Sequence, residues 1–104
     1  MYFNGNIIDH LKLLFENSRD FVFFMRKIGH DYEYVYTNRS ATEMLGKNCN
    51  GETVGQVLDK KAAKFIINHY NSAINKDEQH EFEDYSYFKF LVHKHETTVT
   101  PVHI

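Results

Sequence analysis

Seven histidines are the residues of this 104-residue chain best suited to chemistry, because an imidazole can bind a metal or move a proton near neutral pH. His93 and His95 stand two residues apart in a segment that predicts a strand, so they share one face of it. They could hold a metal together with Glu81 or Glu83. Zinc sites need three or four ligands, and the sequence does not supply the rest convincingly. We therefore expect solvated imidazoles and no metal site.

Groups for catalysis are not found at useful spacings. Ser18 and Ser40 have no histidine base that the sequence places beside them. Glu83 and Asp84 are consecutive residues of a predicted strand, so they point to opposite faces and cannot act as a pair. A glycine-rich phosphate loop is also missing from the sequence. We expect no catalytic residues and no enzymatic activity in this segment.

Composition narrows the class of protein further. The length fits one domain, and a net charge of −2 gives no cationic field for nucleic acid. One cysteine cannot form an intrachain disulfide, which favours a reducing compartment. No apolar run approaches the roughly 20 residues that span a bilayer, and the N-terminus lacks a secretory pattern. We expect a cytoplasmic domain without a membrane span in this segment.

The elements that position these residues begin with an amphipathic helix of about ten residues. Its apolar positions recur at helical spacing, with polar residues between them: Ile7, Ile8, Leu11, Leu14 and Phe15. The sequence Asn-Ser-Arg-Asp at 17–20 ends this helix, because these side chains favour local hydrogen bonds. We expect residues 1–17 to form an N-terminal helix and residues 18–104 to form the core.

Two hairpins are predicted. The apolar run at 21–25 indicates a strand buried on both faces, and residues 32–37 indicate its antiparallel partner after a turn at 29–31. Residues 79–88 and about 90–102 indicate a second pair of strands, joined near Lys89 or across 93–95.

Helices separate the two hairpins. Residues 38–45 predict a short helix with a capping box from Ser40 to Glu43, and Gly46 ends it. Residues 47–55 are polar and predict irregular structure, whereas 59–75 predict the longest helix. This order of elements predicts an α+β fold with an antiparallel sheet.

Several segments, in this order, resemble a PAS domain, the small sensor module of signalling proteins. The resemblance covers about residues 15–102 and rests on the segments SRDFVF at 18–23, YVYTNRSA at 34–41, EMLG at 43–46, VGQVL at 54–58, FEDY at 82–85 and ETTVTPV at 96–102. It implies a five-stranded antiparallel sheet with helices on one face. Bacterial relatives of this subgroup often precede a histidine kinase or a cyclic-di-GMP synthase or phosphodiesterase (GGDEF or EAL output domains).

The resemblance also implies a missing element. The family's fifth strand lies between the first and the fourth, and this sequence ends at Ile104, just after the predicted fourth strand. Two strands would then expose unpaired backbone groups, which are a template for pairing with another chain. We expect a homodimer, with a strand swap, a shifted sheet or an intermolecular sheet as compensation.

Two residues resemble cofactor sites of the family. Gly46-Lys47-Asn48-Cys49 is similar to the start of the flavin photosensor motif, but the chain continues Asn-Gly-Glu-Thr where that branch has Arg-Phe-Leu-Gln. His69 lies on the helix whose histidine binds haem in some relatives, where an axial imidazole is the usual ligand. Both matches are weak alternatives, and we expect no bound cofactor, although an unknown small-molecule ligand is compatible with the family.

The remaining site is a small-molecule pocket between sheet and helices, which the resemblance implies. Its expected lining is mostly apolar: Phe23, Met25, Tyr36, Asn38, Leu45, Val57, Phe65, Ile66, Tyr70, Phe82 and Val99. The alternative is a solid core, since aromatic residues make up 15% of the chain and large rings fill a small domain economically.

The predicted function is a non-catalytic sensor and dimerisation module of a larger bacterial signalling protein. The apolar stripe of residues 7–15 is its expected dimer interface, although the same stripe could cover the sheet. The signal would pass through the C-terminal strand to an output domain. The alternatives are a protein–protein docking domain with a solid core, and a haem or flavin sensor.

Overall fold

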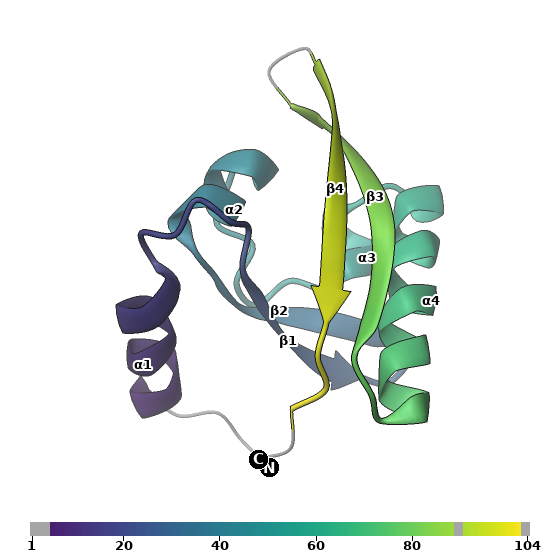
Figure 1. Ribbon diagram of the computed structural model, residues 1–104, viewed down its shortest axis with the longest axis horizontal. Coiled ribbons are helices and arrows are strands. Elements are labelled where there is room, and N and C mark those ends of the chain that lie inside the picture. The colour runs from purple at the N-terminus through teal and green to yellow at the C-terminus, as the bar shows by residue number, and fades with distance from the viewer. Residues whose placement is uncertain (1–4, 89–90, 103–104) are drawn as a thin grey trace. The chain divides into compact units, whose positions relative to one another are not determined.

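The computed structural model describes the backbone of residues 5–88 and 91–102, and the side chains of residues 7–84 and 95–102. These residues form an α+β fold with four helices and two two-stranded antiparallel sheets (Figure 1). The chain divides into two compact units, residues 1–63 and 64–104. The boundary between the two units falls inside the longest helix. It does not test the predicted division into an N-terminal helix at 1–17 and a core at 18–104, which stays a prediction.

The first unit contains a helix, a hairpin and two short helices. In chain order they are α1 (Gly5–Phe15), β1 (Phe23–Ile28), β2 (Asp31–Thr37), α2 (Arg39–Leu45) and α3 (Val54–Val57). The predicted end of α1 before the polar segment 17–20 is confirmed: the Asp20 N–H donates to the Ser18 hydroxyl there.

The predicted first hairpin is confirmed, with β1 antiparallel to β2 and Arg26 opposite Glu33. The register shifts after Phe24, which leaves Val35 as the extra residue of a β-bulge. The strand begins at Phe23 rather than at residue 21, because both backbone groups of Val22 bond to Asn38. Burial on both faces was also wrong, since no residue of β1 is fully buried.

Alternate residues of β2 are deeply buried. Tyr32, Tyr34 and Tyr36 are 3%, 4% and 1% exposed, and the residues between them are only half-buried until the end of the strand. The loop before α3 runs beside β2: the Tyr34 N–H donates to the Glu52 carbonyl, and the Gly51 N–H donates to the Tyr34 carbonyl. This loop therefore supplies β2 with backbone partners on the edge away from β1.

The predicted α2 is confirmed, but its cap differs from the expected one. The helix begins after Asn38, whose side chain accepts the Ala41 N–H, and it ends at Gly46 with φ +82°. The capping box from Ser40 to Glu43 was wrong, because Ser40 already lies inside the helix and its hydroxyl donates to the Ser18 carbonyl. Asn is as good an N-cap as Ser, and only Asn38 stands next to the helix start.

The segment at 47–55 is not wholly irregular, since α3 begins at Val54. Thr53 and Gln56 form the capping box: each side chain accepts the backbone N–H of the other residue. The Thr-x-x-Gln spacing was visible in the sequence and is the signal that could have predicted this helix.

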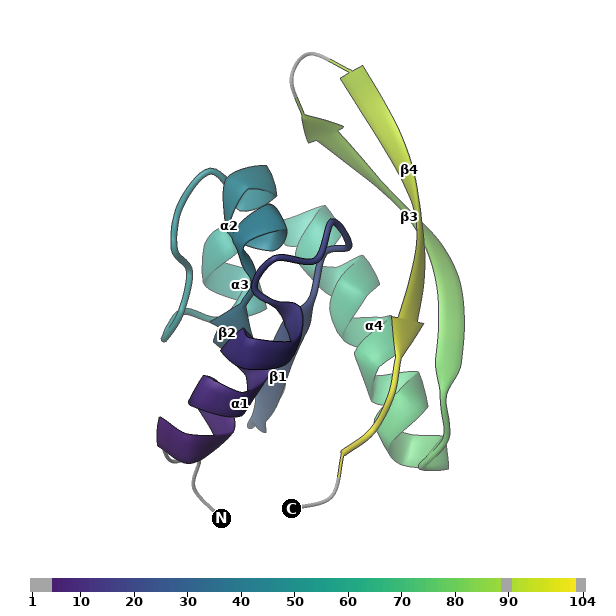
Figure 2. The same cartoon turned by 60° about the vertical axis from the view of Figure 1, so that its left-hand side comes forward.

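The second unit contains most of a long helix and a long hairpin. The elements are α4 (Lys60–Lys76), which begins in the first unit, β3 (His80–Phe88) and β4 (Leu91–Val99). The predicted long helix and the predicted second hairpin are confirmed. Residues 89–90, between the two strands, lie outside the described residues. The hairpin lies beside the residues of α4 that belong to this unit, as both views show (Figure 2).

The strands do not form the single sheet that the family resemblance implies. Among the described residues, β1 pairs with β2 and β3 pairs with β4, so each sheet is one hairpin. No described strand joins the two hairpins into one ladder, so the expected five-stranded sheet is not seen in the described residues. Within the described part of the chain, no helix has the length and apolar character needed to cross a membrane.

Candidate functional site

Two histidines form the most chemically distinctive contact of the second unit. Nδ1 of His69, on α4, lies 2.8 Å from Nε2 of His80, the first residue of β3. In a hydrogen bond between two imidazole nitrogens, one nitrogen carries a proton and donates it, and the other accepts it. One proton therefore lies between these two atoms. The pair thus joins the helix to the start of the hairpin by a hydrogen bond that depends on protonation.

Aromatic rings surround His69. The Phe82 ring stacks on it at a centroid distance of 4.0 Å and an interplanar angle of 6°. The Phe65 ring meets it edge-on at 4.6 Å and also contacts Phe82 at 5.9 Å. We call His69, His80, Phe65 and Phe82 the imidazole cluster. Its apolar rings make the charged form of His69 costly.

The cluster lies on one face of the hairpin. Because alternate residues share a face, Asp84 lies on the side of β3 that carries His80 and Phe82. His95 is the β4 partner of Asp84 and shares that face.

This register bears on the metal clamp that the sequence offered as an alternative to solvated imidazoles. Glu81 and Glu83 lie on the opposite face from His95, so they cannot bind a metal together with it. The side chain of His93 lies outside the described residues. Within residues 7–84 and 95–102, no group of three or more histidine, cysteine, aspartate or glutamate side chains is placed to hold a metal ion.

The electrostatics of the cluster favour the neutral form of His69. Burial is the main cause that lowers the pKa of His69, and the neighbouring His80 ring lowers it further. The Asp84 carboxylate acts in the opposite direction. The net effect is a His69 imidazole that gives up its added proton more readily than a free histidine.

Sequence reasoning named three members of this cluster but did not bring them together. It gave His69 as a weak haem candidate and placed Phe65 and Phe82 in the pocket lining, and it did not consider His80. The signal was the helical spacing of Phe65 and His69, followed after the turn by His80 and Phe82 on one strand face. That spacing places an aromatic pair on each of the two elements.

In the first unit, the Asn38 side chain is a structural hub. It is fully buried, and its Oδ1 accepts the backbone N–H groups of Val22 and Ala41. Its Nδ2 donates to the carbonyls of Phe15, Ser18 and Asp20, at 3.0, 3.4 and 2.7 Å. The amide thus joins the end of α1, the start of β1 and the start of α2.

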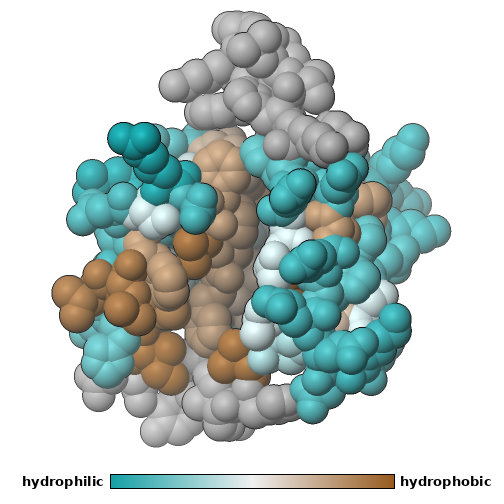
Figure 3. Space-filling model, viewed as in Figure 1, coloured by the Kyte–Doolittle hydropathy of each residue, from teal (hydrophilic) through white to brown (hydrophobic). Residues whose placement is uncertain are grey.

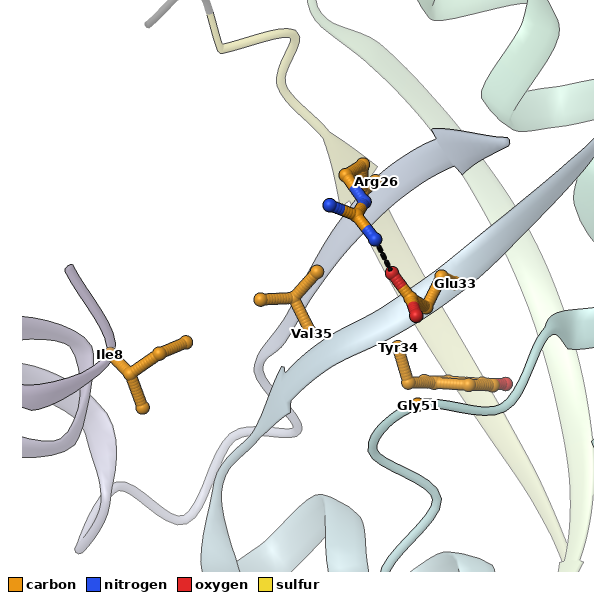
Figure 4. A pocket seen from close by; sticks show the side chains of 6 residues that line it. All are labelled: Ile8, Arg26, Glu33, Tyr34, Val35 and Gly51. Carbon is orange, nitrogen blue, oxygen red and sulfur yellow. Dashed lines mark hydrogen bonds and ion pairs between the residues drawn. The ribbon is translucent and has the colours of Figure 1, made fainter. Parts of the chain in front are cut away.

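A pocket of about 270 Å³ lies at the surface of the first unit. Its walls come from α1, the β1–β2 hairpin and the loop before α3: Ile8, Arg26, Glu33, Tyr34, Val35 and Gly51. Figure 4 shows that Arg26 and Glu33 point toward each other across the two strands, where they form an ion pair. Because the guanidinium is neutralised by its neighbour, the pocket presents no net charge to a ligand.

Cys49, which was only a weak candidate for flavin binding, is an interior residue. Cys49 is fully buried, and its thiol donates to the Lys47 carbonyl at 3.7 Å. Burial is the largest cause that raises the pKa of this thiol, while Lys47 opposes the rise and Glu52 adds to it. Burial of the Tyr34 phenol, with smaller effects of Cys49 and Asp31, raises the pKa of Tyr34 to about 12. A thiol in this environment is a poor nucleophile.

The residues expected to line the ligand pocket fall into both units. Those of the first unit are Phe23, Met25, Tyr36, Asn38, Leu45 and Val57, and those of the second are Phe65, Ile66, Tyr70, Phe82 and Val99. Among these rings, Phe65 meets Phe82 within the second unit, whereas in the first unit Phe23 contacts Tyr34, which is not an expected lining residue, at 6.1 Å. The pocket that these residues would share stays a prediction.

The residues of the expected dimer interface differ in how exposed their side chains are. Ile7, Ile8, Leu11 and Phe15 are half-buried, whereas Leu14 is 69% exposed. Leu13, which the predicted stripe left out, is 83% exposed. Hydrophobic colour gathers over α1 at the left of Figure 3, as expected for these leucines. The end of α1 thus presents two neighbouring leucines to solvent.

Comparison with known proteins identifies no relative of this chain among protein families or curated proteins. No family model matches the chain, and no curated protein is significantly similar to it. The function must therefore be argued from the residues themselves.

Proposed function

We propose that this chain is a non-catalytic sensor and dimerisation module with a PAS-like arrangement. It would serve a larger bacterial signalling protein that carries a histidine kinase or cyclic-di-GMP output domain. Its partner would be a second copy of the same chain, held through α1 and strand edges.

The order of the elements is the observation that carries this proposal. A helix, an antiparallel hairpin, two short helices, a long helix and a second antiparallel hairpin follow one another as the family resemblance predicts. Exposure of Leu13 and Leu14 on α1 supports the dimer, because two neighbouring leucines in water favour a partner that covers them.

Sedimentation velocity tests the dimer. We expect the unaltered chain to sediment as a dimer and Leu14→Glu to sediment as a folded monomer, because a carboxylate in an apolar interface is strongly unfavourable. His10→Glu is the matched control, since His10 is an exposed residue of the same helix, and this variant should remain a dimer. A monomeric unaltered chain, or a dimer that survives Leu14→Glu, would contradict the interface.

Thermal shift tests the sensor. We expect at least one compound in a library of carboxylates and small metabolites to raise the melting temperature, because a ligand that binds only the folded chain stabilises it. If no compound does so while the dimer persists, the result favours the docking domain with a solid core. The absorption spectrum of the fresh protein separates both from a haem or flavin sensor.

A further inference from the structure

The imidazole cluster lies where a change of charge would act on the hairpin. His80 is the first residue of β3, and the turn that precedes it leads directly from the end of α4. Its hydrogen bond to His69 therefore joins the start of β3 to the middle of α4, about two helical turns before that helix ends. The Phe82 ring, two residues further along β3, adds the stacking contact on His69.

Proton counting gives this contact two regimes. With both rings neutral, one N–H lies between Nδ1 of His69 and Nε2 of His80, and the other ring nitrogens complete the tautomers. One added proton can bind at a nitrogen outside the contact, so the hydrogen bond persists and becomes charge-assisted. A second proton must bind the accepting nitrogen, which places two N–H groups and two positive charges face to face. The contact is then repulsive.

The surrounding charges do not cancel this repulsion. On α4, the residues one turn from His69 are Phe65, Ile66, Ser72 and Ala73, which carry no charge. On β3 the facing charge is Asp84, and on β4 the titratable group opposite Asp84 is His95. In the turn before His80, the exposed carboxylates of Asp77 and Glu78 act through solvent, which weakens their effect. Asp84 can balance one imidazolium, but not two or three. Acidification therefore leaves an excess of positive charge on this face.

We propose that the His69–His80 hydrogen bond is a proton-controlled latch. It holds the first residue of β3 on α4 while at most one of the two rings is charged, and it opens when both rings are protonated. The lowered pKa of His69 places its opening below the ordinary histidine range. The latch does not rest on the proposed sensor function, and it would operate in a docking domain as well.

Histidine-selective ¹⁵N NMR on the full chain, with a chelator present to exclude metals, tests the latch directly. At pH 7.5 we expect Nδ1 of His69 and Nε2 of His80 to share one proton, and we expect both rings to become imidazolium as the pH is lowered stepwise. Amide exchange at residues 80–84, corrected for intrinsic rates, should then accelerate about tenfold, as expected for one pKa unit of coupling. The Tyr34 amide, bonded to Glu52 in the other unit, is the internal control and should change less.

Variants separate proton control from a purely structural role. His69→Asn and His80→Gln place an uncharged amide near the position of the ring nitrogen, so they can keep a hydrogen bond but cannot be protonated. We expect the fall of melting temperature between pH 7.5 and 5 to shrink by at least half in either variant. The control His10→Gln removes an exposed histidine of α1 and should leave the fall unchanged.

Two results would overturn the latch. One is an equal pH dependence of melting in the unaltered chain and in both cluster variants. The other is unchanged exchange at residues 80–84 of the unaltered chain after both rings are protonated, which needs no variant to fold. Neither result affects the sedimentation test of the dimer, so the two proposals fail independently.

Discussion

The Tyr36 hydroxyl donates a hydrogen bond to the Glu16 carboxylate at 2.8 Å, across twenty residues of sequence. Tyr36 is 1% exposed in β2, and Glu16 directly follows α1. Burial is the first cause that raises the pKa of Tyr36 to about 12, followed by the hydrogen bond and the charge of Glu16. The contact fastens the C-terminal end of α1 to the hairpin.

Tyr36→Phe should lower the free energy of unfolding of the first unit by about 1.5 kcal/mol, because the variant loses a hydrogen bond to a charged group. The half-buried Glu16 can recover water, which keeps the loss small. Urea denaturation followed by circular dichroism measures it. Glu16→Gln is the control: its amide oxygen still accepts the bond, so its loss should be smaller. An equal loss in both variants would mean that charge, not the hydroxyl contact, is responsible.

Asn38→Ala should be far more damaging, costing about 3 kcal/mol or more, since it leaves buried backbone donors and carbonyls without partners. We expect an early unfolding transition or loss of soluble protein. Asn48→Ala is the matched control, because Asn48 is exposed and accepts only a local bond from the Asn50 N–H. Comparable urea midpoints for the two variants would show that the Asn38 hub is dispensable.

Gly55 is required for space rather than for its backbone angles. A Cβ at this position would lie 2.7 Å from Oδ2 of Asp31, which accepts the Gly55 N–H at 3.1 Å. Asp31 also accepts the Tyr32 N–H, so it cannot move away without losing a bond. Gly55→Ala should therefore cost about 1–3 kcal/mol. In the Asp31→Ala background the same change should cost much less, and strict additivity in this double-mutant cycle would contradict the clash.

Cys49 should react with Ellman's reagent only as the first unit opens. The folded chain disfavours its thiolate, so this group's contribution to stability is present below the ordinary thiol pKa and is lost as the pH rises above it. We expect the labelling rate at pH 8 to follow unfolding in a urea series. The double variant Cys49→Ala, Asn48→Cys moves the thiol to an exposed neighbour and should react at once. Immediate labelling of the unaltered chain would refute the buried placement.

Local pattern was enough to predict the secondary structure apart from α3 and the exact ends of some elements. The short turn around Gly29 forced an antiparallel hairpin, and the polar residues at 17–20 ended α1 where expected. Local pattern could not decide which of two neighbouring residues caps a helix when both have a high propensity for the N-cap position. Ser40 and Asn38 are both good caps, and the choice depends on Val22, which lies sixteen residues away and takes up the Asn38 oxygen.

The candidate site depends even more on contacts between distant residues. His69 and His80 are eleven residues apart, and their hydrogen bond exists because β3 returns along the face of α4 that carries His69. Helical spacing also placed Leu14 in the apolar stripe and left Leu13 outside it, yet both are exposed. Periodicity shows which residues share a face, but not whether another element covers that face.

The row of buried phenols on β2 gives the chain an optical signal of its own. The sequence has no tryptophan, so tyrosine dominates its near-ultraviolet spectrum. Tyr34 and Tyr36 ionise only near pH 12, and the stability that their buried phenols contribute is lost as alkali exceeds the ordinary tyrosine pKa of about 10. Alkaline titration at 295 nm should therefore rise in two waves, and the second wave would report the opening of the first unit without any added label.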